Sequence, residues 1–259
     1  METRPRGSKR RTRQGLTVAF IAGLISSVGL AACSSSTSSA NPFAGKTPGQ
    51  VLALSKAALL AKGSVHVVED ANFSGTTQHI VSDAGTSQGK QVITSSTGNL
   101  TILLVSAQMA FIQGDSTYFE QTFNLPQDEA TKYAGQWIAV PSSSSSYAAL
   151  VTFLTVSSVM TGETPSAPLR FAKPTTIDGK SVVGVSGGLG QYEPSGFHGT
   201  QVLYISAVAP YLPVSVVYHE TNGNGKTITA TDHVSDYGES VSVTTPANSI
   251  PISSIPGAS

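Results

Sequence analysis

Residues 99–113 read NLTILLVSAQMAFIQ, and this stretch decides the fold expected for the chain. It predicts two strands, at 99–107 and 109–113, because β-branched and apolar residues gather there in short runs. Successive side chains of a strand point to opposite faces. Both faces of the first strand are mostly apolar, with Leu100, Ile102 and Leu104 on one and Thr101, Leu103 and Val105 on the other. Such a strand needs cover on both faces.

Two arrangements provide that cover. In the first, a helix lies on one face of the sheet and a second sheet layer lies on the other. In the second, a curved sheet closes partly around a helix at 147–160 and leaves a cavity for an apolar ligand. The alternation of side chains is the same in both arrangements, so this pattern leaves both open.

Short runs of the same kind continue along the chain from residue 64. Typical turn residues separate them, as at Asp178-Gly179 and at Asn222–Gly225. The remaining predicted strands are 64–73, 76–82, 89–96, 116–122, 135–140, 170–176, 180–186, 201–207, 213–220, 226–233 and 239–244. The sequence therefore predicts a long, meandering antiparallel sheet.

The first predicted helix spans residues 48–62. Thr47 is placed to cap it, Pro48 suits its first position, and Gln50 can bond back to the cap. Apolar residues then recur at helical spacing until Gly63, which is typical of the residue that follows a helix.

Two further helices are predicted. Residues 147–160, YAALVTFLTVSSVM, are apolar around most of a helical circumference, which indicates extensive burial. Residues 126–132 form a short helix with acidic residues near its start. The expected class is α+β: a long curved antiparallel sheet, or half-barrel, with helices packed on its concave face.

The chain has one hydrophobic core in this interpretation, with no sequence repeat and no break between domains. A signal peptide is expected at 1–32 and a lipidated, Ser-rich spacer at 33–46. One domain follows at 47–250, and a flexible tail is expected at 251–259.

The N-terminal segment is typical of an exported lipoprotein. Basic residues precede an apolar stretch at Leu16–Ala32, and Leu30-Ala31-Ala32-Cys33 resembles the bacterial lipobox, where a diacylglyceryl group is attached to the thiol. The competing interpretation is a transmembrane anchor, for which 17 residues interrupted by Gly and Ser are marginal. Arg10-Arg11 lacks the following apolar residue of a twin-arginine signal, which favours general secretion. Lipidated Cys33 would anchor the protein to the outer face of the cytoplasmic membrane, in the cell envelope.

Charge excludes one class of partner. Charged residues are 12% of the chain, and after residue 13 the chain holds 9 cationic and 14 anionic residues. Nucleic-acid binding needs a basic face, so no nucleic-acid partner is expected. Cys33 is the only cysteine, so the mature chain has no internal disulfide.

The sequence nominates no catalytic or metal-binding residue. Gly184–Gly188 matches the pattern G-x-S-x-G around Ser186, but the residues that follow cannot form the helix that this motif requires. The five histidines lack metal-ligand spacing, and the acidic residues are scattered. We therefore expect a protein that is not an enzyme and that uses no metal and no cofactor.

Several short motifs resemble the actinobacterial LppX/LprG-type lipoproteins, which share the half-barrel fold of the LolA/LolB lipoprotein carriers. The motifs are a hairpin with Ala110, Phe111, Gly114, Asp115, Tyr118 and Phe119, the strand Trp137–Pro141, and closing segments at Val202–Ile205, Leu212–Val214 and Ser235–Val241. The resemblance covers residues 47–246. The loop at 188–200 has no counterpart in it.

The resemblance implies a lipoprotein that holds the acyl chains of a lipid or glycolipid in a hydrophobic cavity and carries or presents them across the envelope. A membrane transporter would be a further partner. The candidate lining residues, chosen for bulk and position, are Leu100, Ile102, Leu104, Phe111, Phe119, Trp137, Leu150, Phe153 and Leu154. The alternative function is a non-catalytic extracytoplasmic adaptor without lipid cargo.

Overall fold

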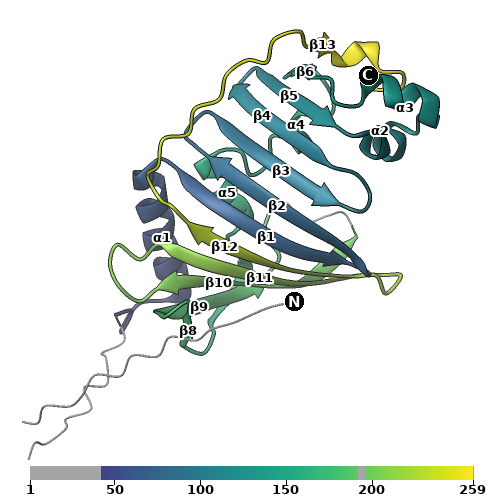
Figure 1. Cartoon of the computed structure of the whole chain (residues 1–259). Helices are drawn as coiled ribbons and strands as arrows, with labels where there is room; N and C mark the ends of the chain where they lie inside the picture. Colours follow the sequence, from purple (N-terminus) through teal and green to yellow (C-terminus); the bar gives the residue numbers. More distant parts are fainter. Residues whose placement is uncertain (1–41, 192–195, 259) are drawn as a thin grey trace, which may run out of the picture. The chain divides into compact units, whose positions relative to one another are not determined.

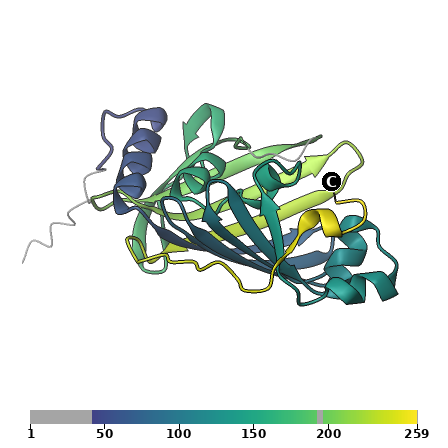
Figure 2. The same ribbon diagram turned by 90° about the horizontal axis from the view of Figure 1, so that it is seen from above.

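The computed structural model describes residues 42–191 and 196–258, which belong to one compact unit. The expected signal peptide, Cys33 and most of the spacer lie outside the described residues. The unit is built on one large curved sheet, with α4 and α5 behind it in Figure 1 and in the hollow of its curve in Figure 2. The expected curved sheet with helices on its concave face is confirmed.

Thirteen strands form this sheet, in the spatial order β13-β6-β5-β4-β3-β2-β1-β12-β11-β10-β9-β7, with β8 paired to β9. The strands are β1 (Val65–Phe73), β2 (Thr76–Ala84), β3 (Gly89–Ser95), β4 (Leu100–Ser106), β5 (Met109–Gly114), β6 (Ile138–Pro141), β7 (Ser166–Phe171), β8 (Thr175–Ile177), β9 (Lys180–Gly188), β10 (Phe197–Ser206), β11 (Pro213–Asn222), β12 (Thr227–Ser235) and β13 (Ile250–Pro251). The predicted antiparallel meander is confirmed, with one parallel pair, β13 on β6. Strand β1 joins the two halves because it pairs with both β2 and β12.

The helices are α1 (Pro48–Lys62), α2 (Ser116–Phe123), α3 (Gln127–Tyr133), α4 (Tyr147–Leu150), α5 (Val156–Gly162) and the 3-10 turn η1 (Ile252–Ser254). Helix α1 has the predicted bounds and the predicted cap. The backbone N–H of Thr47 donates to Gln50 Oε1 at 2.8 Å, and Gln50 N–H donates to Thr47 Oγ1 at 3.3 Å. Gly63 follows the helix with φ +77°, a conformation that glycine adopts without a Cβ penalty.

The strand predicted at 116–122 is wrong, because these residues form α2. Asp115 caps this helix: its Oδ1 accepts a hydrogen bond from Tyr118 N–H at 2.8 Å. Phe119 is then fully buried and stacks on Phe123 with 5.9 Å between ring centroids. The aromatic residues therefore pack through helical spacing, i and i+4, instead of the alternate spacing of a strand.

The single helix predicted at 147–160 is also wrong. Helix α4 ends at Leu150, and α5 begins at Val156 with a new cap at Thr155, whose Oγ1 accepts from Ser158 N–H at 3.1 Å. The break is fixed by the sheet, since Val156 N–H donates to Gly85 O at 2.8 Å in the turn between β2 and β3. Apolar content predicted the burial of this segment but not its bend.

The apolar side chains form two clusters, whereas one core was predicted from the sequence. The first packs α1 and α5 against β1 and β9–β12, and the second packs α2 and α3 against β4–β6. Ile252, Ile255 and Ala258 are buried in the second cluster. The prediction of a flexible tail is therefore wrong for residues 251–258, because these side chains complete a core.

Two other predicted strands differ from the elements observed in the structure. Residues 170–176 divide between β7 and β8, which leaves Pro174, a residue without a backbone N–H, between them. Residues 239–244 form no strand. They belong to an extended segment, residues 236–249, which we call the strap. It crosses the ends of β1 to β5 on its way to β13 (Figure 1, yellow).

The sheet is covered unequally on its two faces. Helices α4 and α5 lie on one face, and the strap runs along the border of the other. The arrangement with a second sheet layer is therefore absent from the described part of the chain, where all strands belong to one sheet.

Candidate functional site

The structure brings together six of the nine candidate lining residues. They lie in or against the second cluster: Leu100, Ile102, Leu104, Phe119, Leu150 and Leu154. All except Leu150 are at most 6% exposed. These side chains form a packed core in the observed structure, and a role for them as ligand contacts stays a prediction.

The other three candidates lie elsewhere. Phe111 pairs in register with Leu103, which places it on the sheet face opposite the helices. Trp137 lines a groove of about 620 Å³ beneath the strap, on that same opposite face. Phe153 lines a pocket of about 160 Å³ on the helix-covered face.

This second cavity, which we call the helix-side pocket, combines apolar walls with acidic groups. Its lining residues are Glu69, Phe73, Phe153, Gly162, Leu189, Gly190, Tyr218, Glu220, Ile228 and Ala230. Strands β1, β11 and β12 supply its floor, and the turn before α5 supplies Phe153. Small-molecule sites often have this composition, with mostly apolar walls and a few polar groups.

The backbone of Phe153 is in an unusual conformation. Its φ is +64°, in the left-handed region that bulky side chains rarely adopt, at a cost of about 1–2 kcal/mol. The flanking bonds hold it there: Leu154 N–H donates to Val151 O at 3.2 Å, and Val156 N–H donates to Gly85 O. Such strain is often found at binding sites, so Phe153 is a candidate functional residue.

A cluster of carboxyl groups lies beside the pocket. Glu163, which follows α5, is 1% exposed, and Asp232 on β12 is 2% exposed. Tyr218 Oη donates to Glu163 Oε2 at 2.7 Å. Glu163 Oε1 and Asp232 Oδ1 are buried without a partner when both groups are ionised. A proton on one carboxyl allows the two to hydrogen-bond to each other.

Burial keeps protons on this cluster near neutral pH. Burial raises the pKa of Glu163 to about 7. Hydrogen bonds from Asp232 and Tyr218 lower this pKa, but their effect is smaller than that of burial. It also raises the pKa of Glu69 to about 8, and the charges of Asp232 and Glu220 add to that effect. The pKa of Asp232 lies well above its ordinary value, first through burial and then through Glu163. At neutral pH the cluster therefore carries less negative charge than its number of carboxyls.

These acidic residues are not among the candidates predicted from the sequence. Glu69 and Asp232 are far apart in the sequence and become direct cross-strand partners. A signal was present in β1, because Glu69 shares the inward face with Val65 and Val67. An acidic residue at an inward position of a strand is rare enough to indicate a special environment.

Ser186 lies within strand β9, which continues to Gly188. Its Oγ donates to the backbone oxygen of Arg170 at 3.3 Å. A Cβ at Gly187 would lie 2.1 Å from Ser166 O, so the close approach of β7 explains a glycine there. This geometry differs from the strand-to-helix turn of a hydrolase nucleophile.

Two of the histidines each lie within hydrogen-bond distance of a single carboxylate. His66 Nδ1 lies 2.7 Å from Asp83 Oδ1, and His79 Nδ1 lies 2.8 Å from Asp70 Oδ1. Within residues 42–191 and 196–258, no group of three or more His, Cys, Asp or Glu residues is placed to hold a metal ion. Nor does any helix in those ranges have the length and apolar character needed to span a membrane.

Solved structures provide the comparisons for this fold. The chain is similar to LprF from Mycobacterium bovis, at 16% identity and a TM-score of 0.47, over 78% of this chain and 97% of that one. It is similar to MucB at 12% identity and a TM-score of 0.39, over 77% and 63% of the two chains. A domain assigned to an outer membrane lipoprotein-sorting protein of Vibrio parahaemolyticus matches at 11% identity and a TM-score of 0.30, over 76% and 95%.

No protein-family model matches the chain, and no curated protein sequence matches it significantly. At these identities the similarity concerns the fold.

Proposed function

We propose that this protein is an envelope lipoprotein that binds the apolar part of a lipid on its helix-covered face and carries or presents that lipid. The observation that carries the proposal is the strained Phe153, whose ring forms a wall of the helix-side pocket. The names of the similar structures, a mycobacterial Lpr protein and a lipoprotein-sorting domain, support the same class of role.

The pocket is small in the observed structure. Its volume of about 160 Å³ accommodates about five groups of water size, at ~30 Å³ each. A long acyl chain therefore requires the turn at 151–155 to move. Strain of about 1–2 kcal/mol at Phe153 lowers the cost of that movement, because leaving the left-handed conformation relieves it.

The apolar walls provide the binding energy. Phe73, Phe153, Leu189 and Ile228 surround the pocket, and each buried methylene contributes about 0.8 kcal/mol. A lipid chain can therefore be held with few polar contacts. The protonated carboxyls at the border reduce the charge that the chain meets.

Lipid loading is the first prediction. We expect the full chain, incubated with phosphatidylglycerol vesicles and then analysed by native mass spectrometry, to carry bound lipid. Phe153→Asp should weaken the affinity for the lipid at least tenfold, about 1.4 kcal/mol, because a charge is placed in the apolar wall, and the bound fraction should fall accordingly. Phe171→Asp is the matched control, since Phe171 is 42% exposed and lies outside the pocket.

Far-UV circular dichroism verifies that both variants keep the β-sheet. Equal loading of the folded Phe153→Asp variant would place the lipid elsewhere. A wild-type chain that takes up no lipid would contradict the proposal and favour the adaptor function.

Lipidation of Cys33 is the second prediction, and it rests on the lipobox at Leu30–Cys33. We expect Cys33→Ala to prevent signal removal and acylation, so that mass spectrometry finds the precursor instead of the acylated mature chain. A variant that still yields a mature-sized, membrane-bound product would contradict it.

A further inference from the structure

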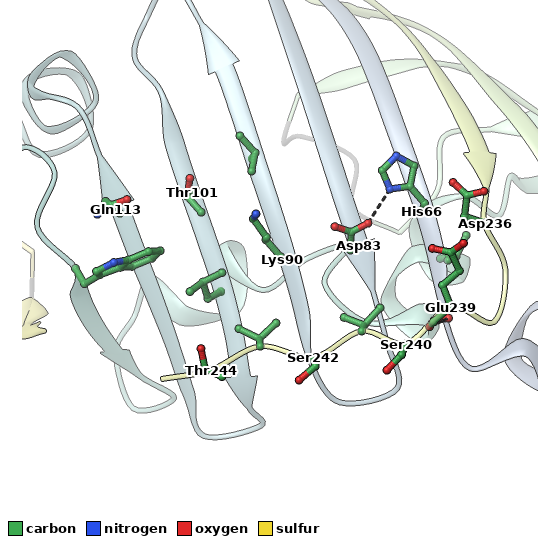
Figure 3. Close-up of a pocket in the computed structure, with 17 residues that line it drawn as sticks. His66, Asp83, Lys90, Thr101, Gln113, Asp236, Glu239, Ser240, Ser242 and Thr244 are labelled. Atoms are coloured by element: carbon green, nitrogen blue, oxygen red, sulfur yellow. Dashed lines mark hydrogen bonds and ion pairs between the residues drawn. The ribbon is translucent and has the colours of Figure 1, made fainter. Parts of the chain in front are cut away.

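The groove beneath the strap lies on the sheet face that the helices leave uncovered, and we call it the strap groove. Figure 3 views it with the strap along one side and strands β1 to β5 behind. Its volume of about 620 Å³ lies within the range of small-molecule sites. Because the helix-side pocket opens on the opposite face, the strap groove requires its own explanation.

A row of polar side chains crosses the floor of this groove. His66, Asp83 and Lys90 occupy paired positions on β1, β2 and β3, so they are direct neighbours on one face. Thr101 and Gln113 are paired in the same way on β4 and β5. Figure 3 shows these five side chains in a row across the neighbouring strands. They offer both hydrogen-bond donors and acceptors within one groove.

Apolar surfaces lie between the polar groups. Val92 and Leu103 belong to the floor, Trp137 lies at one end, and Val241 and Val243 come from the strap. The occupant of the groove must therefore offer apolar patches and hydrogen-bonding groups in alternation. An acyl chain would bury Lys90 and its polar neighbours without partners, which costs about 1–3 kcal/mol for each group.

The strap is fixed before any ligand arrives. Gln88 Nε2 donates to Val243 O at 3.2 Å, and Val243 N–H donates to Gln88 Oε1 at 3.4 Å. Near the start of the strap, Gly238 N–H donates to Ser64 O at 3.1 Å, and directly after its end Ile250 N–H donates to Trp137 O at 2.9 Å. A wall that is already in place lowers the entropic cost of binding.

The same bonds argue against an extended peptide as the occupant. A peptide that adds a strand needs free backbone groups on the edge it joins. Gln88 already holds the backbone N–H and C=O of Val243, at the centre of the strap. Recognition in the strap groove therefore depends mainly on side chains.

The charged side chains of the strap groove further restrict the class of ligand that it can bind. Asp83, Asp236 and Glu239 face the groove, against Lys90 and His66. An anionic ligand would meet three carboxylates, one of which is already paired with His66. A neutral ligand with many hydroxyl groups avoids that repulsion. Its hydroxyls can form hydrogen bonds with the carboxylate, amide and amine groups of the groove.

We propose that the strap groove binds a neutral oligosaccharide, with one sugar ring on the indole of Trp137 and the ring hydroxyls bonded to Lys90, Gln113 and their neighbours. A sugar ring has an apolar face and a polar edge, which matches the alternation in the groove. Indole rings suit such amphipathic contacts, because a large apolar surface is combined with a single polar group. This site is separate from the proposed lipid site.

Trp137 also provides the fluorescence signal for the test, because it is the only tryptophan of the chain. The probes are hexasaccharides of glucose, mannose, galactose and N-acetylglucosamine, titrated into the full chain in a detergent without a sugar headgroup. We expect a saturable change in tryptophan emission with at least one probe. Gln113→Ala should weaken that binding about tenfold, which is about 1.4 kcal/mol, through the lost hydrogen bond to Gln113 Oε1, since Gln113 Nε2 already donates to Gly135 O at 2.8 Å.

Gln108→Ala is the matched control, because Gln108 is exposed in the turn between β4 and β5 and does not line the groove. The Gln108→Ala chain should bind the hexasaccharide as tightly as the wild-type chain does. Phe153→Asp, which changes only the proposed lipid site, should also leave hexasaccharide binding unchanged. The proposal is overturned if no hexasaccharide changes the emission, or if Gln113→Ala binds as tightly as Gln108→Ala. A response to apolar heptapeptides with none to sugars would overturn it too and assign the groove to a peptide.

Discussion

Raising the pH from about 5 to about 8 should lower the free energy of unfolding, because the buried Glu163 and Asp232 hold protons more tightly in the folded chain than in the unfolded one. The pKa of Glu163 rises from 4.5 to about 7 on folding, and each pKa unit corresponds to about 1.4 kcal/mol. Between these two values the folded chain holds a proton that the unfolded chain has released. Stability therefore falls as the pH rises through this window. Glu69 extends the decline to about pH 8.

The acidic groups act together because they face one another from several elements. Glu163 follows α5, Glu69 lies on β1, Asp232 on β12, and Tyr218 and Glu220 on β11. The charges that raise the pKa of Glu69 come from acidic residues alone. Deprotonation consequently places like charges in a space of low dielectric, where their repulsion is strong.

Urea unfolding of the full chain, followed by circular dichroism across this pH range, measures the effect. Glu163→Gln should remove the largest part of the decline, since the amide keeps an oxygen for Tyr218 and gains a permanent donor for Asp232. Asp128→Asn, an exposed position on α3, serves as the control and should retain the decline. Equal pH dependence in the two variants would show that Glu163 holds no proton of this kind.

The parts of the fold that could be predicted are those whose signals lie close together in sequence. The bounds of α1 follow from Thr47, Gln50 and Gly63, which act within the helix they limit. The meander follows from alternation within each strand and from turn residues between strands. These signals need no knowledge of the tertiary neighbours.

The wrong predictions concern segments whose conformation is determined by a contact with residues far away in the sequence. The bend between α4 and α5 depends on Gly85 O, about seventy residues earlier in the chain. The ordering of the C-terminal residues depends on a cluster whose other members lie on β4 to β6. Helix α2 is a different case, because its cap at Asp115 is local, whereas the family resemblance placed Asp115 in a hairpin.

Only part of the candidate site could be predicted from the sequence, for the same reason. Phe153 was nominated for its bulk, but its left-handed backbone follows from the bend. The carboxyl cluster joins single residues from β1, β12 and the end of α5, and no spacing in the sequence relates them. The strap groove needs both the sheet register and the path of residues 236–249, of which a segment was predicted as another strand.

Gly89→Ala should destabilise the chain by about 3 kcal/mol, the second large effect expected here. A Cβ at residue 89 would lie 2.1 Å from Leu154 O, in the turn that carries Phe153. The contact is with backbone, so no side-chain rotation relieves it and the turn must move away from the sheet. Gly223→Ala is the matched control, because a Cβ there meets nothing within 4 Å and its φ suits alanine. That control should be neutral or stabilised by about 0.4–1 kcal/mol. Urea midpoints of the two variants decide the matter, since equal stability would mean that the turn does not press on β3.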